Sequence, residues 1–434
     1  MHPANLPAGT TGLPAGTTGL PASPASPAAS GDNPASGDNP AVGGDAAPRT
    51  PAVRSKLPAV GTTIFSVMSA LAARHGAVNL GQGFPDFDCD PALVRAVTDA
   101  MAAGHNQYPP MAGLPALLQV VAQKIHALHG HVYNPADDIT ITAGATEGLM
   151  TTILAIAGSG DEVIVLDPCY DSYVPAITLA GALAVRVPLA GVSFRPDFAR
   201  IAAAITPRTR AILVNTPHNP SGTVWTDHDM LQLQALLAPT DILVISDEVY
   251  EHMVFDGLAH QSVSRFAGLA ARAFVVSSFG KTCHVTGWKV GYVAAPAPLT
   301  AQFRMVHQFN VFSVNTPMQA GFAAFLARPA PYLALPAFYQ RKRDLFRAGL
   351  ARTGLRLLPC EGTYFQCVDY SGLQVAERDL DEAQFCQWLT AEVGVAAIPL
   401  SAFYGDGRNQ QLARFCFAKQ DATLHTAIER LARL

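Results

Sequence analysis

The 434-residue sequence has few charged residues and no long apolar run. Charged side chains make up 14% of the chain, and 29 basic residues against 33 acidic ones give a net charge of −4. Nothing in this balance predicts a polyanionic partner, so we expect no nucleic-acid partner. No apolar run reaches the roughly 18 residues that span a bilayer. We therefore expect no membrane anchor. The N-terminus also lacks a basic segment followed by an apolar one, so we expect no secretory signal.

The cysteines are few and show no pairing pattern. They number seven, which is odd, and no two have the CxxC spacing (Cys89, Cys169, Cys283, Cys360, Cys367, Cys386 and Cys416). This usage argues against a disulfide framework or a zinc cluster. We therefore predict reduced thiols, a cytoplasmic protein and no metal site.

The first 54 residues contain no aromatic side chain but hold 10 of the 33 prolines. They also contain tandem copies of LPAGTTG (6–12 and 13–19) and of ASGDNP (29–34 and 35–40). Such a segment cannot bury enough apolar surface to offset the entropy of ordering. We predict that residues 1–54 form a disordered, low-complexity extension.

The rest of the chain contains short apolar runs, each followed by small or polar residues. The runs are Ile139–Thr142, Val163–Leu166, Ala211–Val214, Ile242–Ile245 and Phe274–Val276. Runs in which apolar and polar residues do not alternate are typical of strands that are buried on both faces and joined by helical crossovers. We therefore predict an α/β fold with a mostly parallel sheet between helices, and a ligand site beyond the carboxyl ends of the strands.

Four segments follow from these patterns. Residues 1–54 are the extension, 55–90 an arm that joins the small domain, 91–325 a large domain and 326–434 a small α+β domain. Within the small domain we expect helices at Ala337–Leu350 and Leu424–Leu434, and strands at Thr363–Val368 and Ala397–Leu400.

Three loops at the expected strand ends offer groups for an anionic, flat ligand. Gly144, Ala145 and Thr146 open a helix whose free N–H groups can hold a phosphate. Tyr170 can cover a ring, and the Asn219 side chain can donate to an oxygen. Each has an ordinary alternative, namely a plain helix start, structural packing and a simple turn.

Two further strand ends carry charge. Asp247 ends a buried strand and needs a cation or strong donors, and Tyr250 follows it. Ser278 can donate to a phosphate that Lys289 can pair with, and Lys281 supplies an amine. Together these groups match pyridoxal 5′-phosphate, which needs a lysine amine and an acid for its ring nitrogen.

The motifs that contain these residues are similar to those of fold-type I, class I/II aminotransferases. They are NLGQGFPDF (79–87), NQY (106–108), NTPHNPSGTVW (215–225), ISDEVYEH (245–252), SSFGKTCHVTGWKVGY (277–292), EGTYF (361–365) and IPLSAFY…RFCFAK (398–419). The chain resembles most the branch of methionine aminotransferases and kynurenine–oxoglutarate (glutamine) aminotransferases. The resemblance runs from about Leu57 to the C-terminus.

This resemblance implies roles at the cofactor. Lys281 would bind the cofactor covalently and move the substrate proton. Asp247 would keep the ring nitrogen protonated, and Tyr250 with Asn219 would donate to the ring oxygen. Tyr170 would stack on the ring. The phosphate would be held by the backbone of Ala145 and Thr146, the side chains of Ser278 and Lys289, and Tyr108 of the other subunit.

The resemblance also implies roles at the substrate. Arg414 would bind the α-carboxylate as a bidentate fork, helped by Asn219 and the Gly83 backbone. Phe65, Phe365 and Phe312, the last from the neighbouring subunit, would line the side-chain pocket. The implied enzyme is a homodimeric, pyridoxal-phosphate-dependent aminotransferase of amino-acid metabolism. It would pass the amino group of methionine or an aromatic-type L-amino acid to a 2-oxo acid by a ping-pong mechanism.

Some positions depart from the family. Lys289 stands where most members have arginine, Cys283 where relatives tend to have an aromatic residue, and Phe65 where kynurenine-specific relatives have tryptophan. His284 has no matching role and is interpreted as a packing residue.

Three alternatives stay open at this point. The same site could serve kynurenine transamination, or it could act as a β-lyase that eliminates the thiol from cysteine S-conjugates. A regulatory module fused to a DNA-binding segment is a third hypothesis. It is disfavoured because Arg49 and Arg54 are the only arginines or lysines in the extension.

Overall fold

The computed structural model describes residues 50, 52–58, 60–373 and 379–434. Residues 55–434 form one unit. The prediction of a disordered extension over 1–54 lies almost wholly outside the described residues and stays a prediction. Among the described residues, no helix is long and apolar enough to cross a membrane.

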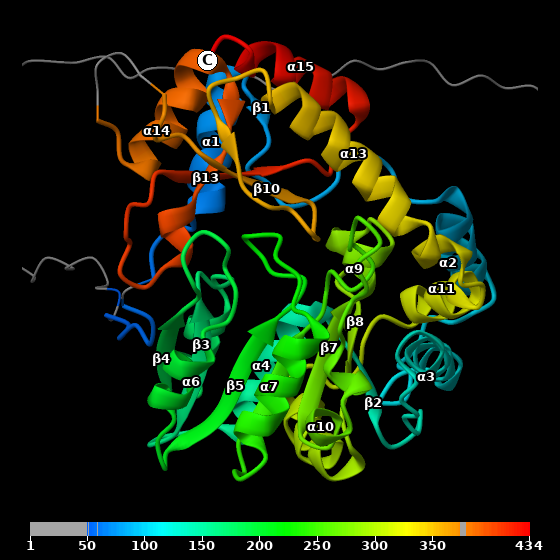
Figure 1. The fold of residues 1–434 in the computed structure, drawn as a ribbon. Helices are drawn as coiled ribbons and strands as arrows, with labels where there is room; N and C mark the ends of the chain where they lie inside the picture. The colour runs from blue at the N-terminus through cyan, green and yellow to red at the C-terminus, as the bar shows by residue number, and fades with distance from the viewer. Residues whose placement is uncertain (1–49, 51, 59, 374–378) are drawn as a thin grey trace, which may run out of the picture. The chain divides into compact units, whose positions relative to one another are not determined.

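A seven-stranded sheet forms the centre of this unit (Figure 1), with the strand order β2-β8-β7-β6-β5-β3-β4. Its strands are β2 (Ile139–Thr142), β3 (Glu162–Asp167), β4 (Leu183–Pro188), β5 (Thr209–Asn215), β6 (Leu243–Asp247), β7 (Ala273–Ser278) and β8 (Gly291–Ala294). Strand β8 pairs antiparallel with both of its neighbours, β2 and β7, and the other pairs are parallel. The five predicted strands and the mostly parallel sheet are therefore confirmed, whereas β4 and β8 were not predicted.

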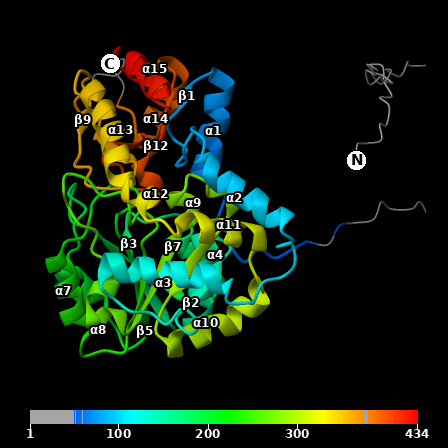
Figure 2. The same ribbon diagram turned by 90° about the vertical axis from the view of Figure 1, so that its right-hand side faces the viewer.

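Apolar side chains on both faces of the sheet explain why its strands read as continuous apolar runs. On β5, Ala211 and Leu213 belong to a buried cluster with residues of α4, α5 and α10, whereas Ile212 and Val214 belong to a second one that includes residues of α3 and α7. The helices of this part are α2 (Pro91–Ala102), α3 (Pro115–His129), α4 (Gly144–Ile156), α5 (Tyr173–Leu179), α6 (Phe198–Ala204), α7 (Asp227–Leu237), α8 (Ala267–Ala270), α9 (Phe279–Thr282), α10 (Ala297–Asn310) and α11 (Thr316–Leu326), with η1 (Val263–Arg265) and η2 (Thr286–Trp288). Figure 2 shows α3 crossing in front of the sheet.

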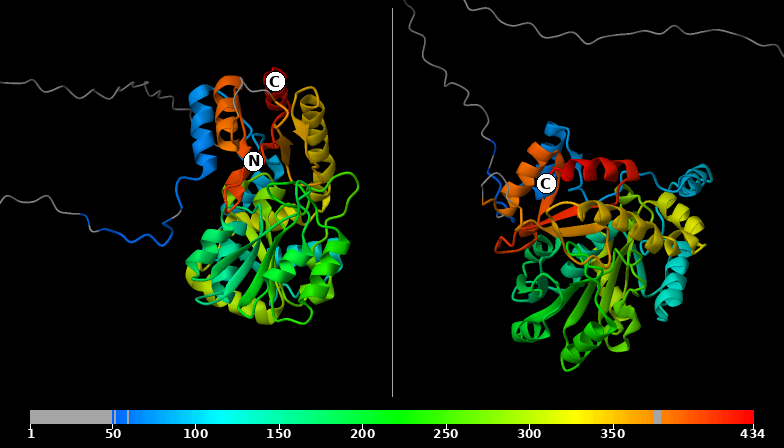
Figure 3. Two further views of the ribbon diagram at one scale, coloured as in Figure 1. Left: turned by 60° about the vertical axis from the view of Figure 1, so that its left-hand side comes forward. Right: turned by 45° about the horizontal axis from the view of Figure 1, so that its top comes forward.

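The C-terminal residues and the segment before α2 form a second layer beside the carboxyl ends of the strands (Figures 1 and 3). Its antiparallel sheet has the order β12-β13-β10-β9, and β1 pairs with β11. The elements are α1 (Ile64–His75), β1 (Val78–Asn79), α12 (Ala330–Leu333), α13 (Leu335–Leu350), β9 (Arg356–Leu357), β10 (Phe365–Asp369), α14 (Glu382–Trp388), η3 (Leu389–Val393), β11 (Val395–Ala396), β12 (Ile398–Pro399), η4 (Leu400–Phe403), β13 (Leu412–Cys416) and α15 (Asp421–Leu431).

The predicted elements of this layer are present with shifted ends. Helix α13 begins two residues earlier than predicted, and α15 begins three residues earlier. Strand β10 begins two residues later than predicted. Pairing of β1 with β11 joins the N-terminal segment to the C-terminal one. Helix α11 runs across residue 325, where the large domain was predicted to end, and the domain limits stay a prediction.

Candidate active site

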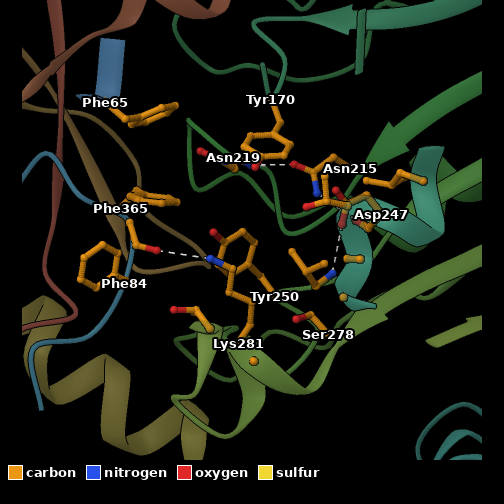
Figure 4. A pocket seen from close by; sticks show the side chains of 18 of the residues that line it. Phe65, Phe84, Tyr170, Asn215, Asn219, Asp247, Tyr250, Ser278, Lys281 and Phe365 are labelled. Carbon is orange, nitrogen blue, oxygen red and sulfur yellow. Dashed lines mark hydrogen bonds between the residues drawn. The ribbon is translucent and has the colours of Figure 1, made fainter. Parts of the chain in front are cut away.

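A cavity of about 300 Å³ lies at the carboxyl ends of the strands, where the two layers meet. This is where ligands bind in open α/β sheets. The predicted site residues that line it are Phe65, Gly83, Ala145, Thr146, Tyr170, Asn219, Asp247, Tyr250, Ser278, Lys281, Lys289, Phe365 and Arg414. Figure 4 shows the rings of Tyr170 and Tyr250 near Asp247, and the Lys281 side chain reaching into the same space.

One end of the cavity brings together groups that can attract an anion. It is formed by the start of α4 together with Ser278 and Lys289. Gly144 has φ +78°, and a Cβ added there would meet Lys289 Cε at 3.3 Å. Lys289 itself has φ 54°, a left-handed conformation that is strained for lysine and is typical of functional sites. The helix N-terminus and the ammonium group therefore converge at one point.

Asp247 ends β6 inside the protein, where it is 4% exposed. Burial raises the pKa of its carboxyl group to about 6, although hydrogen bonds from the Tyr173 phenol and the Val249 amide oppose this effect. The phenol lies 2.6 Å from Asp247 Oδ2. Asn215 Nδ2 also donates to the Asp247 backbone oxygen at 2.8 Å. A cation beside this carboxylate would offset the cost of its burial.

Lys281 lies in the short helix α9, directly after β7. Its Nζ donates to the Tyr364 hydroxyl at 2.9 Å and to the Gly83 carbonyl at 3.2 Å. The same Nζ lies 5.6 Å from the centre of the Tyr250 ring. Burial lowers the pKa of Lys281 to about 8, which leaves part of the amine neutral and nucleophilic near neutral pH.

Arg414 on β13 is 1% exposed and stands among aromatic rings. Its guanidinium carbon lies 3.9 Å from the centre of the Phe365 ring and 4.9 Å from that of Phe403. One terminal nitrogen donates to Asn219 Oδ1 at 2.8 Å. Its Nε has no hydrogen-bond partner among the described residues, so a buried donor is left for a ligand.

Two predicted residues do not line this cavity. The rings of Tyr108 and Phe312 lie 5.3 Å apart and are 81% and 46% exposed. Both were predicted to act in the site of the other subunit, so their distance from the cavity of their own chain does not contradict that prediction.

Sequence reasoning missed Tyr173, which lines the cavity, and Tyr364 and Phe403, which contact Lys281 and Arg414. A second phenol three residues after Tyr170 in DPCYDSY was a signal for Tyr173. Tyr364 stands in the EGTYF motif beside Phe365, but nothing in the sequence indicated that its hydroxyl would meet Lys281. His284 contacts the rings of Phe87 and Tyr339, in line with its interpretation as a packing residue.

These donors fit pyridoxal 5′-phosphate. The start of α4 with Lys289 suits its phosphate, Asp247 suits a protonated ring nitrogen, and the partly neutral amine of Lys281 suits its aldehyde. The unpartnered Nε of Arg414 suits the carboxylate of an amino acid beside the cofactor. The fold and the cavity thus define a pyridoxal-phosphate-dependent enzyme of fold type I.

Comparison with known proteins identifies the family. The sequence pattern of "Aminotransferase class I and II" matches residues 76–431. The methionine aminotransferase of Escherichia coli (strain K12) is 52% identical over 382 residues, which cover 88% of this chain and 98% of that protein. Human kynurenine–oxoglutarate transaminase 1 is 34% identical over 394 residues, covering 84% and 93% respectively.

Solved structures agree with the sequence comparison. The Escherichia coli protein YbdL, described with a methionine aminotransferase function, superimposes with a TM-score of 0.86 over 89% of this chain and 100% of its own at 52% identity. N-succinyldiaminopimelate aminotransferase from Mycobacterium tuberculosis gives a TM-score of 0.84 at 41% identity, covering 88% and 100%. The chain belongs to the class I and II aminotransferases. It is a transaminase that uses pyridoxal 5′-phosphate.

Proposed function

We propose that this aminotransferase takes its amino group from methionine or from another neutral, aromatic-type L-amino acid and passes it to a 2-oxo acid. The observation that carries the proposal is the surrounding of Arg414, which is enclosed by Phe65, Phe365 and Phe403. An aromatic wall favours a side chain without charge, because a second carboxylate would lose its water without gaining a partner.

The cations of the cavity support the same choice. Among the described residues that line it, only Lys281, Lys289 and Arg414 are lysines or arginines. The proposed roles use all three, for the amine, the phosphate and the α-carboxylate. No further cation is left there for the second carboxylate of a dicarboxylic donor. The flexible, polarisable thioether of methionine suits an aromatic pocket, and the Escherichia coli relative is named for methionine.

The residues divide the chemistry between them. When bound, pyridoxal 5′-phosphate supplies a ring that withdraws electrons from the substrate Cα. Arg414 orients the α-carboxylate, and Asn219 Oδ1 holds the guanidinium in place. Lys281 Nζ would take the proton from Cα of the donor in one half of the cycle and give a proton to Cα of the new amino acid in the other, for which a pKa of about 8 is suited. Asp247 keeps a proton on the ring nitrogen, with Tyr173 holding its carboxylate.

A homodimer is part of the proposal. Met305 and Phe309 stand one turn apart on α10 and are 61% and 85% exposed, close in sequence to Phe312. Tyr108 contacts Phe312 and is 81% exposed. Such an apolar patch is typical of a contact surface. A second copy on it would place Tyr108 and Phe312 at the neighbouring site.

We also propose that the enzyme is cytoplasmic, where free cysteines such as those of this chain stay reduced.

Kynurenine is the second candidate donor, because transaminases named for it in human, rat and mouse are 32–34% identical to this chain. Steady-state rates with methionine, phenylalanine, kynurenine and aspartate, each with the same saturating 2-oxo acid, test the proposal. We expect kcat/KM for methionine or phenylalanine to exceed that for aspartate by at least about tenfold. A preference for aspartate contradicts the neutral pocket. Release of pyruvate from a cysteine S-conjugate without any oxo acid would instead indicate the β-lyase.

A further inference from the structure

Next to the cofactor acid, a second group of titratable side chains lies outside the cavity. Glu248 follows Asp247 directly, but its carboxylate faces His129 at the end of α3 and His260 in the loop before η1. One ligand atom from each of the three lies within 4.8 Å of the other two. The side chains of His129, Glu248 and His260 are 7%, 1% and 6% exposed. The transamination chemistry uses none of them.

Three of the four imidazole nitrogens of this cluster lack hydrogen-bond partners among the described residues. Neither nitrogen of His129, nor Nδ1 of His260, has a hydrogen-bond partner among the described residues. Buried polar atoms are nearly always satisfied, since leaving one without a partner costs stability. Three such nitrogens at one place, beside a carboxylate, indicate that the cluster binds something.

The carboxylates are oriented by other side chains. Glu248 Oε1 accepts from Ser246 Oγ at 2.8 Å and from the Val263 amide at 3.0 Å. Its Oε2 is therefore the oxygen that faces His260 Nε2, at 2.9 Å. This is the support that metal-ligating carboxylates usually have from their neighbours.

A second carboxylate reaches the same place. Glu251 Oε1 accepts from Lys124 Nζ and Ser277 Oγ. Its other oxygen, Oε2, lies 3.8 Å from His129 Nε2. The cluster thus offers two imidazoles and two carboxylates, of which Glu251 is also paired with Lys124 through its other oxygen.

We propose that His129, Glu248 and His260 bind Zn²⁺, with Glu251 as the fourth ligand. Imidazole and carboxylate are zinc ligands, whereas calcium and magnesium prefer oxygen alone. Ligand atoms at about 2.0–2.2 Å from zinc lie roughly 3.4 Å apart in a tetrahedron, so the side chains close inward by small rotations. Zinc takes the place of the proton between His260 Nε2 and Glu248 Oε2, and that proton is released to the solvent. Zinc fixes the residue after Asp247 and so has a structural role behind the cofactor.

The test uses the holoenzyme, dialysed against EDTA and then titrated with ZnCl₂ in the presence of a competing indicator. We expect a single zinc ion per chain, and a melting temperature that rises with zinc concentration. His129→Gln should weaken zinc binding by at least about 100-fold, since even the loss of an outer-shell partner costs 10–100-fold. His126→Gln is the matched control, because His126 is exposed on the same helix and outside the cluster. It should bind zinc like the unchanged protein.

Cobalt distinguishes this site from zinc held by a thiol or by the cofactor. Co²⁺ in a site of two imidazoles and carboxylates should give visible d–d bands without a thiolate charge-transfer band, and His260→Gln should abolish them. Cofactor absorbance of each variant checks that it is folded. The proposal is overturned if the holoenzyme binds no zinc, or if His129→Gln and His126→Gln bind it equally. Either result would mean that these three side chains form hydrogen bonds with one another and bind no metal. The outcome does not depend on which amino acid is the donor.

Discussion

The phenol of Tyr173 donates to the carboxylate of Asp247 across 2.6 Å, and both side chains are buried. This contact joins the first turn of α5 to the end of β6. It favours the charged carboxylate, because a phenol stabilises the anion by donation. Burial acts in the opposite direction and is the larger effect, which places the pKa of Asp247 at about 6. The negative charge of Asp247, which would pair with the cofactor ring, is thus stabilised by the hydrogen bonds from Tyr173 and Val249.

Replacing Tyr173 with phenylalanine should weaken transamination most at low pH. Loss of this hydrogen bond raises the pKa of Asp247 further. As the pH falls, the carboxylate of the variant is therefore protonated at a higher pH than that of the unchanged enzyme. A hydrogen bond of this kind contributes roughly 1.5–3 kcal/mol, so we expect the acid limb of kcat/KM to move up by about one pH unit. Tyr370→Phe is the control, since its hydroxyl donates to Leu380 away from the cavity. An unshifted acid limb in Tyr173→Phe would contradict this role.

Asp247→Asn should keep the cofactor but lose most of the activity. Asparagine preserves the shape of the side chain and can still contact Tyr173, but it does not hold a proton on the ring nitrogen. We expect kcat to fall by at least about 100-fold, or about 2.7 kcal/mol. Cofactor affinity, followed by absorbance during dialysis, should fall much less. A near-normal kcat would remove Asp247 from the mechanism.

The reactivity of Lys281 should follow its lowered pKa. Because the pKa is about 8 and not 10.5, the neutral, nucleophilic fraction grows as the pH rises through 8 and is nearly complete at pH 9. The rate at which the apoenzyme takes up pyridoxal 5′-phosphate should therefore rise about tenfold from pH 7 to pH 9 and then level off. Stopped-flow absorbance measures this rate. A rate that keeps rising to pH 10 would indicate an ordinary lysine. Borohydride reduction and peptide mapping of the holoenzyme should place the label on Lys281.

Much of the large sheet could be predicted because its strands are buried on both faces and therefore consist of consecutive apolar residues. The loops after those runs carried Asp247, Ser278 and Lys281, so strand direction alone brought these residues to one edge. Strand β4 was missed because Leu183 and Arg186 are exposed on this edge strand, which reads as a mixed segment. Strand β8 was missed because its sequence, GYVA, begins with glycine and ends with alanine and so does not stand out as an apolar run.

Contacts between distant segments could not be predicted from local patterns. Without the family resemblance, Arg414 reads as a surface residue beside a strand, although β13 is buried and pairs with β10 and β12. Tyr364, just before β10, meets Lys281 of α9 although 83 residues separate them in the chain, and no local pattern indicates this contact. The cluster of His129, Glu248 and His260 has the same origin, since His129 comes from a distant segment, α3, although Glu248 and His260 are 12 residues apart.

Arg414→Lys tests the substrate end of the cavity. Arginine presents a flat, weakly hydrated guanidinium that stacks on the Phe365 ring and donates to Asn219 while its Nε stays available. Lysine is a compact, strongly hydrated charge that cannot do all of these at once. We expect kcat/KM for methionine to fall by at least about 100-fold, mainly through KM.

Arg408→Lys is the matched control for this change. Arg408 also lies over an aromatic ring, that of Tyr404, but it does not line the cavity. Its replacement should leave kcat/KM within about twofold of the unchanged enzyme, since surface substitutions away from a site have small effects. Steady-state kinetics with methionine, at a fixed saturating 2-oxo acid, compare the two variants. If Arg414→Lys lowers kcat/KM no more than Arg408→Lys does, the α-carboxylate is held by another group and the orientation proposed for the substrate is wrong.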